Sequence, residues 1–379
     1  MKTDDRLMSF FVYGVKLILI LVFLCYNIVE MWWLNLNIYN LTKEEMISYV
    51  LDKGYKKFYG EELFTWLYQK RITNLDEMTN LKKEFREIIS KDFVFGTVKL
   101  TVVEKDKDVE KYLFTLKDNE HIEAVLMKHD YGLSLCISSQ LGCNMGCKFC
   151  ESGRRKKQRN LTTGEMVEQI LLIEDNCGMR ISHVVVMGIG EPFDNYDNLC
   201  NMIKIINDPK GLAIGARHLT VSTCGIVPKI KEFADFPYQV NLAISLHAPN
   251  DKLRKEIMPI AKAYSLSELM DALNYYIKKT NRRVTFEYIL LKDVNDSEEN
   301  AKELTKLIKG MNAYVNLIPY NATEHLQFSR SNTLNIAKFY DILKKNNICV
   351  TIRREFGSKI SAACGQLRSK KEELWRHFV

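Results

Sequence analysis

The stretch Ser138–Gly153, SSQLGCNMGCKFCESG, holds three cysteines, Cys143, Cys147 and Cys150, in the spacing C-x3-C-x2-C. A structural zinc site needs four ligands, and the nearest histidines are not at ligand spacing from these cysteines. A cubane 4Fe–4S cluster is held by thiolates on its irons, so three thiolates leave one iron open to a small molecule. The spacing therefore predicts an iron–sulfur cluster with one open iron.

The composition is that of a folded enzyme, with 379 residues of which 46% are hydrophobic and 27% charged. This length accommodates one large α/β domain and a smaller one. Ten cysteines, three of them close together, indicate a reducing compartment with a metal site, and we expect a cytoplasmic protein. The net charge of +7 is compatible with RNA as a polyanionic substrate and equally with an ordinary basic surface.

The first 36 residues differ from the rest of the chain. The run Phe10–Val29 is almost wholly apolar and long enough to span a membrane. Trp32 and Trp33 follow it in place of a small-residue cleavage site, which suits an interfacial anchor rather than a cleaved signal. The alternative is that the biological protein starts later in the sequence, at a residue such as Met31, and that these residues are upstream sequence. We favour a dispensable or mis-assigned extension over a membrane anchor for residues 1–36.

Residues 37–98 are predicted to form a small helical accessory domain. In NLTKEEMISYV, Thr42 and Glu45 have the spacing of a capping box, which starts a helix. Met46, Val50 and Leu51 are predicted to share the apolar face of that helix. Two further helix-like stretches follow in the same segment.

Strands dominate beyond this segment. Residues 99–130 contain three strand-like runs joined by charged turns and are predicted as a β-rich connector. Over residues 131–345, short apolar runs alternate with helix-like stretches, which indicates βαβ units and a parallel sheet. We predict an α/β fold, a partial (β/α)6 TIM-like barrel, with residues 346–379 adding a last strand and a segment that carries Cys364. Ligands of such barrels bind at the carboxyl ends of the strands, where this sequence has CISSQLGC, GIGEP, STCG, SLH and PYN.

Placed directly after the first strand of such a barrel, C-x3-C-x2-C is characteristic of the radical S-adenosylmethionine (SAM) superfamily. The resemblance implies that the open iron binds the amino and carboxylate groups of SAM. Glu191 in MGIGEP is placed to accept the SAM amino group, Ser222 and Ser245 to contact its ribose or carboxylate, and Asn321 its adenine. His247, by residue type alone, is more often a packed histidine than a ligand.

From about Ile38 to Leu367 the chain resembles the Cfr/RlmN family of radical SAM RNA methyltransferases. Generic radical SAM proteins lack the cysteine of the last shared motif, here Cys364, which this family uses covalently. The resemblance implies methylation of an adenine ring carbon in 23S rRNA, free of the assembled ribosome. The shared motifs are IEAVLM, CISSQLGCNMGCKFC, RNLT, MGIGEP, VSTCGIVP, AISLHAPND, VNLIPYN and AACGQL.

The resemblance also implies a route that uses two SAM molecules. One SAM methylates Cys364, and the second is cleaved to a radical that abstracts hydrogen from that S-methyl group. The carbon then adds to adenine, and Cys136 resolves the protein–RNA crosslink by forming a disulfide with Cys364. Glu123 aligns with the proton acceptor of the family. By residue type alone, Glu123 suggests an ordinary surface strand position and Cys364 a buried small residue.

The binding residues are also assigned by the resemblance. A basic segment beside the cysteines, GRRKKQR, is expected to contact RNA phosphates, while TNRR (280–283) and TIRRE (351–355) are weaker candidates against a solvated charged loop. A flavodoxin-type electron donor is implied, and no stable protein partner. The expected SAM contacts are Gly190, Glu191, Ser222, Ser245, Leu246, His247 and Asn321, and the expected RNA contacts are Arg154, Arg155, Lys156, Lys157 and Arg159.

Two branches of the family share this machinery. RlmN makes 2-methyladenosine, whereas Cfr makes 8-methyladenosine and confers resistance to antibiotics that bind the peptidyl transferase centre. CISSQ and REFGSKI resemble Cfr, VSTCGIVP and IPYN resemble RlmN, and the overall length is similar to the Cfr(C)-type enzymes. Glu151 and Ser361 depart from the family pattern. We expect methylation at C8 of adenosine 2503, with RlmN-type C2 methylation, and with it tRNA activity, as the alternative.

Two alternatives come from other classes of protein. One is a radical SAM enzyme that acts on a small molecule or a protein, for which Cys364 would be dispensable. The other is an RNA-binding module with a structural metal, which would contain zinc and no acid-labile sulfide.

Overall fold

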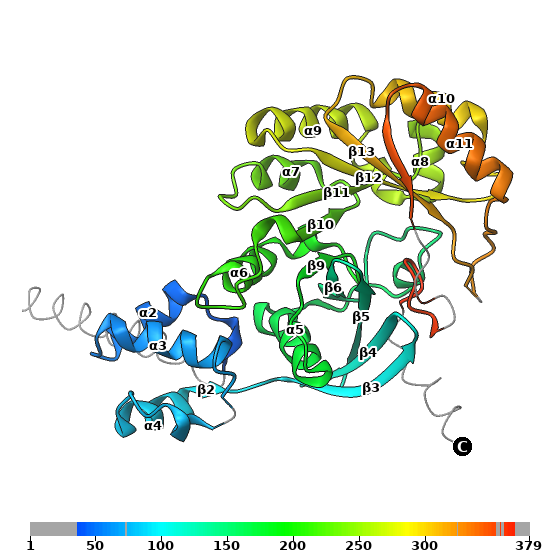
Figure 1. Cartoon of the computed structure of the whole chain (residues 1–379). Helices are drawn as coiled ribbons and strands as arrows, with labels where there is room; N and C mark the ends of the chain where they lie inside the picture. Colours follow the sequence, from blue (N-terminus) through cyan, green and yellow to red (C-terminus); the bar gives the residue numbers. More distant parts are fainter. Residues whose placement is uncertain (1–35, 73, 324, 354–356, 358–359, 368–379) are drawn as a thin grey trace, which may run out of the picture. The chain divides into compact units, whose positions relative to one another are not determined.

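The computed structural model describes residues 36–72, 74–323, 325–353, 357 and 360–367. The chain separates into two compact units, Met1–Gly96 and Thr97–Val379, which are described one at a time (Figure 1). The apolar run Phe10–Val29 lies outside the described residues. Of the helices within the described ranges, none combines the length and apolar character that crossing a membrane requires.

The first unit is helical, as predicted. The capping box is confirmed, because Glu45 N–H donates to Thr42 Oγ1 at 3.3 Å and Thr42 N–H donates to the Glu45 carboxylate at 2.8 Å. The unit contains the parallel pair β1 (Leu36–Asn37) and β2 (Phe93–Val94), the 3-10 helices η1 (Ile38–Asn40) and η2 (Leu75–Glu77), and the helices α2 (Lys43–Asp52), α3 (Lys57–Tyr68) and α4 (Lys83–Asp92).

The buried face of α2 differs from the predicted one at a single position. Met46 and Val50 are buried as predicted, but Leu51 is 52% exposed and Tyr49 is buried in its place. Successive helical residues are about 100° apart, so positions three and four after Met46 share its face and position five does not. The prediction for Leu51 was wrong for this reason.

The second unit is built on one ten-stranded sheet in the order β14-β13-β12-β11-β10-β9-β6-β5-β4-β3. The strands from β6 to β14 are parallel, whereas β3, β4 and β5 extend the same sheet in antiparallel fashion. The strands are β3 (Val98–Asp106), β4 (Val109–Leu116), β5 (His121–His129), β6 (Gly132–Ile137), β9 (His183–Val186), β10 (Leu219–Thr223), β11 (Asn241–Ser245), β12 (Val284–Leu290), β13 (Ala313–Pro319) and β14 (Cys349–Ile352), with a separate pair β7 (Gln140–Leu141) and β8 (Arg159–Asn160).

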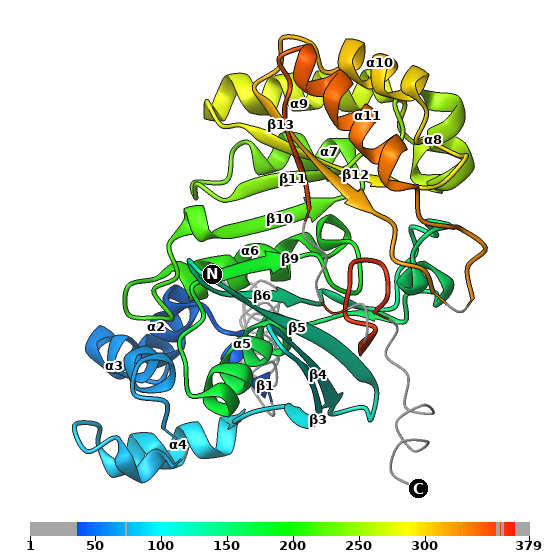
Figure 2. The same cartoon turned by 45° about the vertical axis from the view of Figure 1, so that its right-hand side comes forward.

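Helices connect the parallel strands and cover the outer face of this sheet (Figures 1 and 2). Each of the seven apolar runs beyond residue 131 forms a strand, which confirms the predicted α/β fold with a partial barrel. The helices are α5 (Thr163–Cys177), α6 (Tyr196–Asn207), α7 (Val227–Phe233), α8 (Asp251–Ile257), α9 (Leu266–Thr280), α10 (Glu298–Leu307) and α11 (Thr333–Lys345), with 3-10 helices η3 (Glu151–Arg154), η4 (Pro192–Asn195), η5 (Ala216–His218) and η6 (Pro259–Lys262).

Candidate active site

The three cysteines of the C-x3-C-x2-C motif lie together at the carboxyl end of β6. Cys143, Cys147 and Cys150 line one cavity of about 150 Å³. Their loop is fixed through its backbone, because Cys143 N–H donates to Arg155 O at 2.9 Å and Cys150 N–H donates to Cys147 O at 3.1 Å. The thiols are therefore held on a loop of defined conformation rather than on a free segment.

The chemistry of this donor set fits an iron–sulfur cluster. Burial raises the pKa of Cys143 to about 12 and also raises the pKa values of Cys147 and Cys150. Buried thiolates are stable only beside bound cations, and cluster irons are such cations. Within the described residues, no three His, Cys, Asp or Glu side chains converge as a site for one metal ion. A cubane does not require such convergence, because each cysteine binds a different iron.

Glu191 reaches the same cavity because two glycines bring its loop against the strand ends. A Cβ on Gly188 would lie 2.7 Å from Ile137 O, and one on Gly190, whose φ is +110°, would lie 2.6 Å from the Gln140 Cβ. Glu191 N–H then donates to Gln140 Oε1 at 2.9 Å. Only glycine permits this approach, which explains the spacing of GIGEP.

The Glu191 carboxylate is buried and held from both sides. Its Oε1 accepts a hydrogen bond from Phe193 N–H at 3.1 Å, and its Oε2 accepts one from Cys224 N–H at 2.8 Å. Burial raises the pKa of Glu191 above its usual value. An ammonium group bound in the cavity would compensate this desolvation, as the predicted role requires. Ser222 and Ser245 line the same cavity.

His247 is oriented by the backbone of the neighbouring strand. Its φ is +57°, and its Nδ1 accepts a hydrogen bond from Ile289 N–H at 3.0 Å. Burial, with a smaller contribution from Arg254, lowers the pKa of His247 to about 3. The ring is therefore neutral with its proton on Nε2, and it also packs edge-on against Phe149 at a centroid distance of 4.8 Å.

Two other predicted SAM contacts differ in position. Leu246 is fully buried and lines none of the three cavities described. Its N–H donates to Glu287 O, and its O accepts from Arg254 Nε. Asn321 lines an adjoining cavity of about 70 Å³. Its Oδ1 is buried without a hydrogen-bond partner. That unpartnered oxygen is what a site for an absent polar ligand would show.

Cys136 on β6 and Cys364 near the end of the described chain line this adjoining cavity together with Cys150. The C-terminal segment docks on the cysteine loop, since Glu151 N–H donates to Gly365 O at 2.9 Å and Ser152 Oγ donates to Leu367 O at 2.7 Å (Figure 2). All nine cysteines in the described part of the chain are free thiols. Burial raises the pKa of Cys136 to about 12, so this thiol is neutral at pH 7.

Glu123 is not on the surface, which corrects the expectation from residue type. It lies on β5 and is 6% exposed, with Lys111 Nζ 3.8 Å from its carboxylate. Side chains two apart on a strand share a face. Glu123 therefore shares a face with Val125, which pairs with Cys136 across the sheet. It lines none of the three cavities described.

The basic segment beside the cysteine loop is largely neutralised by the chain itself. Within the described residues, four of its five basic side chains form ion pairs with carboxylates, and Lys156 is the exception. The pairs are Arg154–Glu151 at 3.1 Å, Arg155–Glu120 at 2.7 Å, Lys157–Asp194 at 2.6 Å, and Arg159 with Asp118 at 2.7 Å and Glu165 at 2.8 Å.

Two arginines belong to the site although the sequence did not single them out for it. Arg254 on α8 is fully buried and donates to Cys224 O at 2.6 Å and to Leu246 O at 3.2 Å, which fixes two strand ends that border the cavity. Arg353 and Cys364 both line this cavity and the adjoining one. The pKa of Arg353 is raised, and the largest cause is the neighbouring sulfur of Cys364. No local sequence pattern distinguishes Arg254 from the other charged residues of its helix. Arg353 was predicted only as a candidate phosphate contact, within TIRRE.

Comparison with known proteins agrees with this arrangement. Residues 137–305 match the radical SAM superfamily, and residues 36–94 match the ribosomal RNA large subunit methyltransferase N-terminal domain. A crystal structure of a radical SAM methyltransferase from Sphaerobacter thermophilus superposes with a TM-score of 0.84 and 39% identity, covering 88% of this chain and 100% of that one.

Two curated relatives extend the similarity along nearly their whole length. The probable dual-specificity RNA methyltransferase RlmN of Spiroplasma citri is 52% identical over 90% of this chain and 99% of its own length. That of Enterococcus faecalis (strain ATCC 700802 / V583) is 53% identical over 88% and 96%.

The barrel, with its three-cysteine loop and the cavity beside that loop, defines a radical SAM protein, a class whose cofactors are a 4Fe–4S cluster and SAM. Sequence identity above 50% along almost the full length of the RlmN relatives identifies the family within this class. The chain belongs to the RlmN family.

Proposed function

We propose that this protein is an RNA methyltransferase of the RlmN type that methylates C2 of adenosine in RNA, with adenosine 2503 of 23S rRNA and tRNA as its substrates. The observation that carries the proposal is the pair Cys136 and Cys364, which share one cavity with the cluster-loop residue Cys150. The relatives named as dual-specificity RlmN support C2 over the C8 expectation of the Cfr branch. We place the protein in the cytoplasm with a flavodoxin-type electron donor.

The chain's own residues have distinct parts in this proposal. The cluster and SAM, when bound, supply a methyl group and a radical. Cys143, Cys147 and Cys150 hold the cluster, while Glu191, Ser222, Ser245, His247 and Asn321 hold SAM.

Cys364 Sγ accepts the methyl group, and Arg353 lies beside it in the same cavity. Cys136 keeps its proton until late in the reaction, because burial disfavours its thiolate. Its sulfur then bonds to that of Cys364 as the bond from Cys364 to the transferred carbon breaks. The electron pair of the broken bond stays with that carbon, which gains a proton in exchange for the one that Cys136 loses and so becomes the methyl group. Glu123 lines none of the three cavities described, and we assign it the proton from the ring carbon on the family resemblance alone.

The test uses anaerobically reconstituted protein with SAM, a reductant and an unmodified 23S rRNA fragment or tRNA. Digestion and mass spectrometry should give 2-methyladenosine from both RNAs. Cys364→Ala should give no methylated adenosine while retaining iron and sulfide, which would also exclude a small-molecule radical SAM activity. Detection of 8-methyladenosine would instead return the protein to the Cfr branch.

A further inference from the structure

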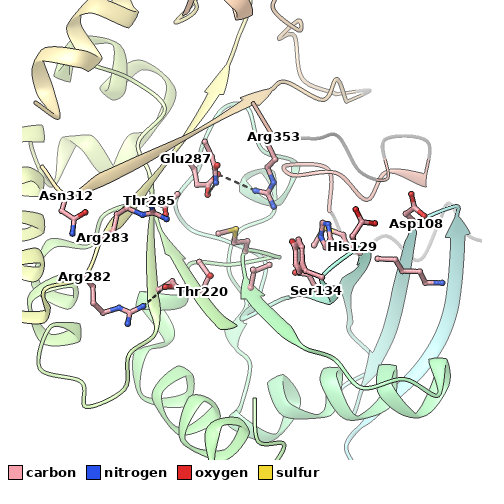
Figure 3. A pocket seen from close by; sticks show the side chains of 18 of the residues that line it. Asp108, His129, Ser134, Thr220, Arg282, Arg283, Thr285, Glu287, Asn312 and Arg353 are labelled. Atoms are coloured by element: carbon pink, nitrogen blue, oxygen red, sulfur yellow. Dashed lines mark hydrogen bonds and ion pairs between the residues drawn. The ribbon is translucent and has the colours of Figure 1, made fainter. Parts of the chain in front are cut away.

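A third cavity, far larger than the two beside the cysteines, opens at the other end of the barrel. Its volume is about 970 Å³, near the upper limit of about 1,000 Å³ for ligand pockets. Asn241 begins β11, while Arg283 and Asn312 precede β12 and β13, so this cavity lies at the amino ends of the parallel strands. Figure 3 shows Arg282, Arg283 and Asn312 on one side of it, across from His129 and Ser134.

The large cavity leads to the reactive cysteines. Met187 and Arg353 line it and also line both smaller cavities. Glu287, which is paired with Arg353 at 3.6 Å, lies between the large cavity and the cavity of the cluster loop. The smaller cavities hold about 70 and 150 Å³, so the large one offers the most room of the three for an RNA segment that approaches Cys364.

A row of aromatic rings stands at the rim of the large cavity. Tyr131, in the turn between β5 and β6, is 65% exposed and stacks on His129 with ring centroids 4.6 Å apart. Its edge meets His183 at 5.1 Å, and His183 stacks on His218 at 4.4 Å. His129 and Tyr131 themselves line the cavity. Exposed aromatic rings in such a row are stacking platforms for unpaired bases.

Arginines with no carboxylate partner lie across from this row. Arg282 donates to Asn241 Oδ1 at 2.6 Å, and its Nε is buried without a partner. The Arg283 guanidinium lies over the Tyr314 ring at 4.8 Å. Within the described residues, neither guanidinium has a carboxylate at ion-pair distance, whereas four of the five basic side chains of GRRKKQR are paired. Phosphates would therefore find two guanidinium groups without a carboxylate partner on this side of the cavity, which Asp108, Asp130 and Glu287 also line.

We propose that the large cavity is the entry site for a single-stranded RNA segment. An unpaired base next to the target stacks on Tyr131, and Arg282 and Arg283 bind the adjoining phosphates. The target adenine then passes Met187 and Arg353 to reach Cys364 from the end opposite the cofactors. This inference deepens the proposed function and rests on it.

The test measures RNA affinity directly, with reconstituted holoenzyme and a fluorescein-labelled 23S rRNA fragment followed by fluorescence anisotropy. Tyr131→Ala should weaken binding about tenfold, because base stacking on an aromatic ring contributes about 1–3 kcal/mol. Tyr131→Phe, which keeps the ring, should restore affinity. The double variant Arg282→Ala/Arg283→Ala should lower the slope of log K against log salt by about 1.4, since each phosphate contact to a single strand contributes about 0.7.

Matched controls lie on the outer helices. Tyr275→Ala removes a tyrosine that is 42% exposed on α9, and Lys302→Ala/Lys306→Ala removes two positive charges from α10. Both should bind RNA within twofold of the wild type. Iron content and thermal unfolding of every variant establish that it is folded and loaded.

Two results would overturn the inference. One is unchanged affinity and salt dependence in both cavity variants; the other is loss of binding in Arg155→Ala/Lys157→Ala alone, which would place RNA at the cluster-loop face. The proposed function fails separately. Wild-type protein that binds RNA through Tyr131 and the arginines but yields no methyladenosine supports the entry site and contradicts the activity. Methylation that is unaffected in the cavity variants supports the activity and contradicts the entry site.

Discussion

The two ends of the barrel are constructed differently. At the carboxyl ends of the strands, the polar groups are fixed by backbone contacts: Glu191 by two amides, His247 by Ile289 N–H and Arg254 by carbonyls. At the amino ends, the Arg282 side chain donates to Asn241 and the Arg283 guanidinium lies over the Tyr314 ring, and in the described part of the chain neither has a carboxylate at ion-pair distance. The first arrangement is rigid and suits a small ligand of constant shape. The second leaves side chains that can adapt to a macromolecule.

This contrast predicts where a substitution damages the protein and where it changes binding alone. Groups at the carboxyl end should matter for cofactor content and stability, because their partners are buried and cannot be replaced by water. Substitutions of groups at the amino end should leave the stability of the fold nearly unchanged. Four substitutions test this difference, in order of decreasing expected effect.

The largest effect is expected for Cys147→Ala. With one of three thiolates removed, the cluster should be lost. Iron and acid-labile sulfide should then fall from about four atoms each per chain to a small fraction of that amount. Cys177→Ala is the control, because that thiol lies at the end of α5, where its Sγ donates to the Glu174 and Met179 carbonyls, and it lines none of the three cavities described. Equal iron content in the two variants would contradict the assignment of the cluster loop.

Arg254→Met should destabilise the protein by about 3 kcal/mol, because it leaves buried carbonyls without a donor. Arg282→Met at the opposite end loses one hydrogen bond, to Asn241, and should cost about 1 kcal/mol. Urea unfolding of both variants in parallel measures the difference. A cost for Arg282→Met as large as that for Arg254→Met would break the contrast between a rigid and an adaptable end.

Gly190→Ala should cost about 2 kcal/mol more than Gly178→Ala. Both glycines have positive φ, +110° and +66°, so both substitutions carry backbone strain of about 1 kcal/mol. At Gly178 nothing lies within 4 Å of the added Cβ, whereas at Gly190 the Gln140 Cβ would lie at 2.6 Å. Equal unfolding midpoints for the two variants would show that the loop relaxes and that the close approach is not required.

Much of the carboxyl end could be predicted from the sequence, because its chemistry lies in short motifs at strand ends. The spacing of Cys143, Cys147 and Cys150 and the loop with Gly190 and Glu191 are local features of this kind. Alternation of strands and helices then places such motifs on one face. The same logic predicted the α/β fold, since each apolar run beyond residue 131 is long enough to be a strand.

The amino end could not be predicted in this way. TNRR and GRRKKQR are similar as sequences, and their difference lies in which carboxylates the fold brings to them. Glu120, for example, is 35 residues from Arg155, and no local pattern links the two. Arg254 is hidden for the same reason, because its carbonyl partners lie on other strand ends. Long-range electrostatic pairing is a property of the tertiary structure alone.

The last effect, no larger than that of Gly190→Ala, concerns pH and His247. Burial holds the pKa of this ring at about 3 in the folded chain, against 6.5 for an unperturbed histidine. The unfolded state therefore binds a proton that the folded state does not as the pH falls below 6.5, and stability is lost between there and pH 3. At pH 5 this loss amounts to about 2 kcal/mol, since each pH unit contributes about 1.4 kcal/mol. His247→Asn keeps an acceptor near Ile289 N–H and tolerates the positive φ without titrating.

The measurement is urea unfolding at pH 7 and pH 5 for the wild type and His247→Asn. The variant should lose about 2 kcal/mol less than the wild type between the two pH values. His183→Asn is the comparison, because this ring is half-buried and stacks on His218, and burial followed by the charge of His218 lowers its pKa. A wild type and a His247→Asn variant that respond to acid equally would mean that water reaches this ring, and the carboxyl end would then be as adaptable as the amino end.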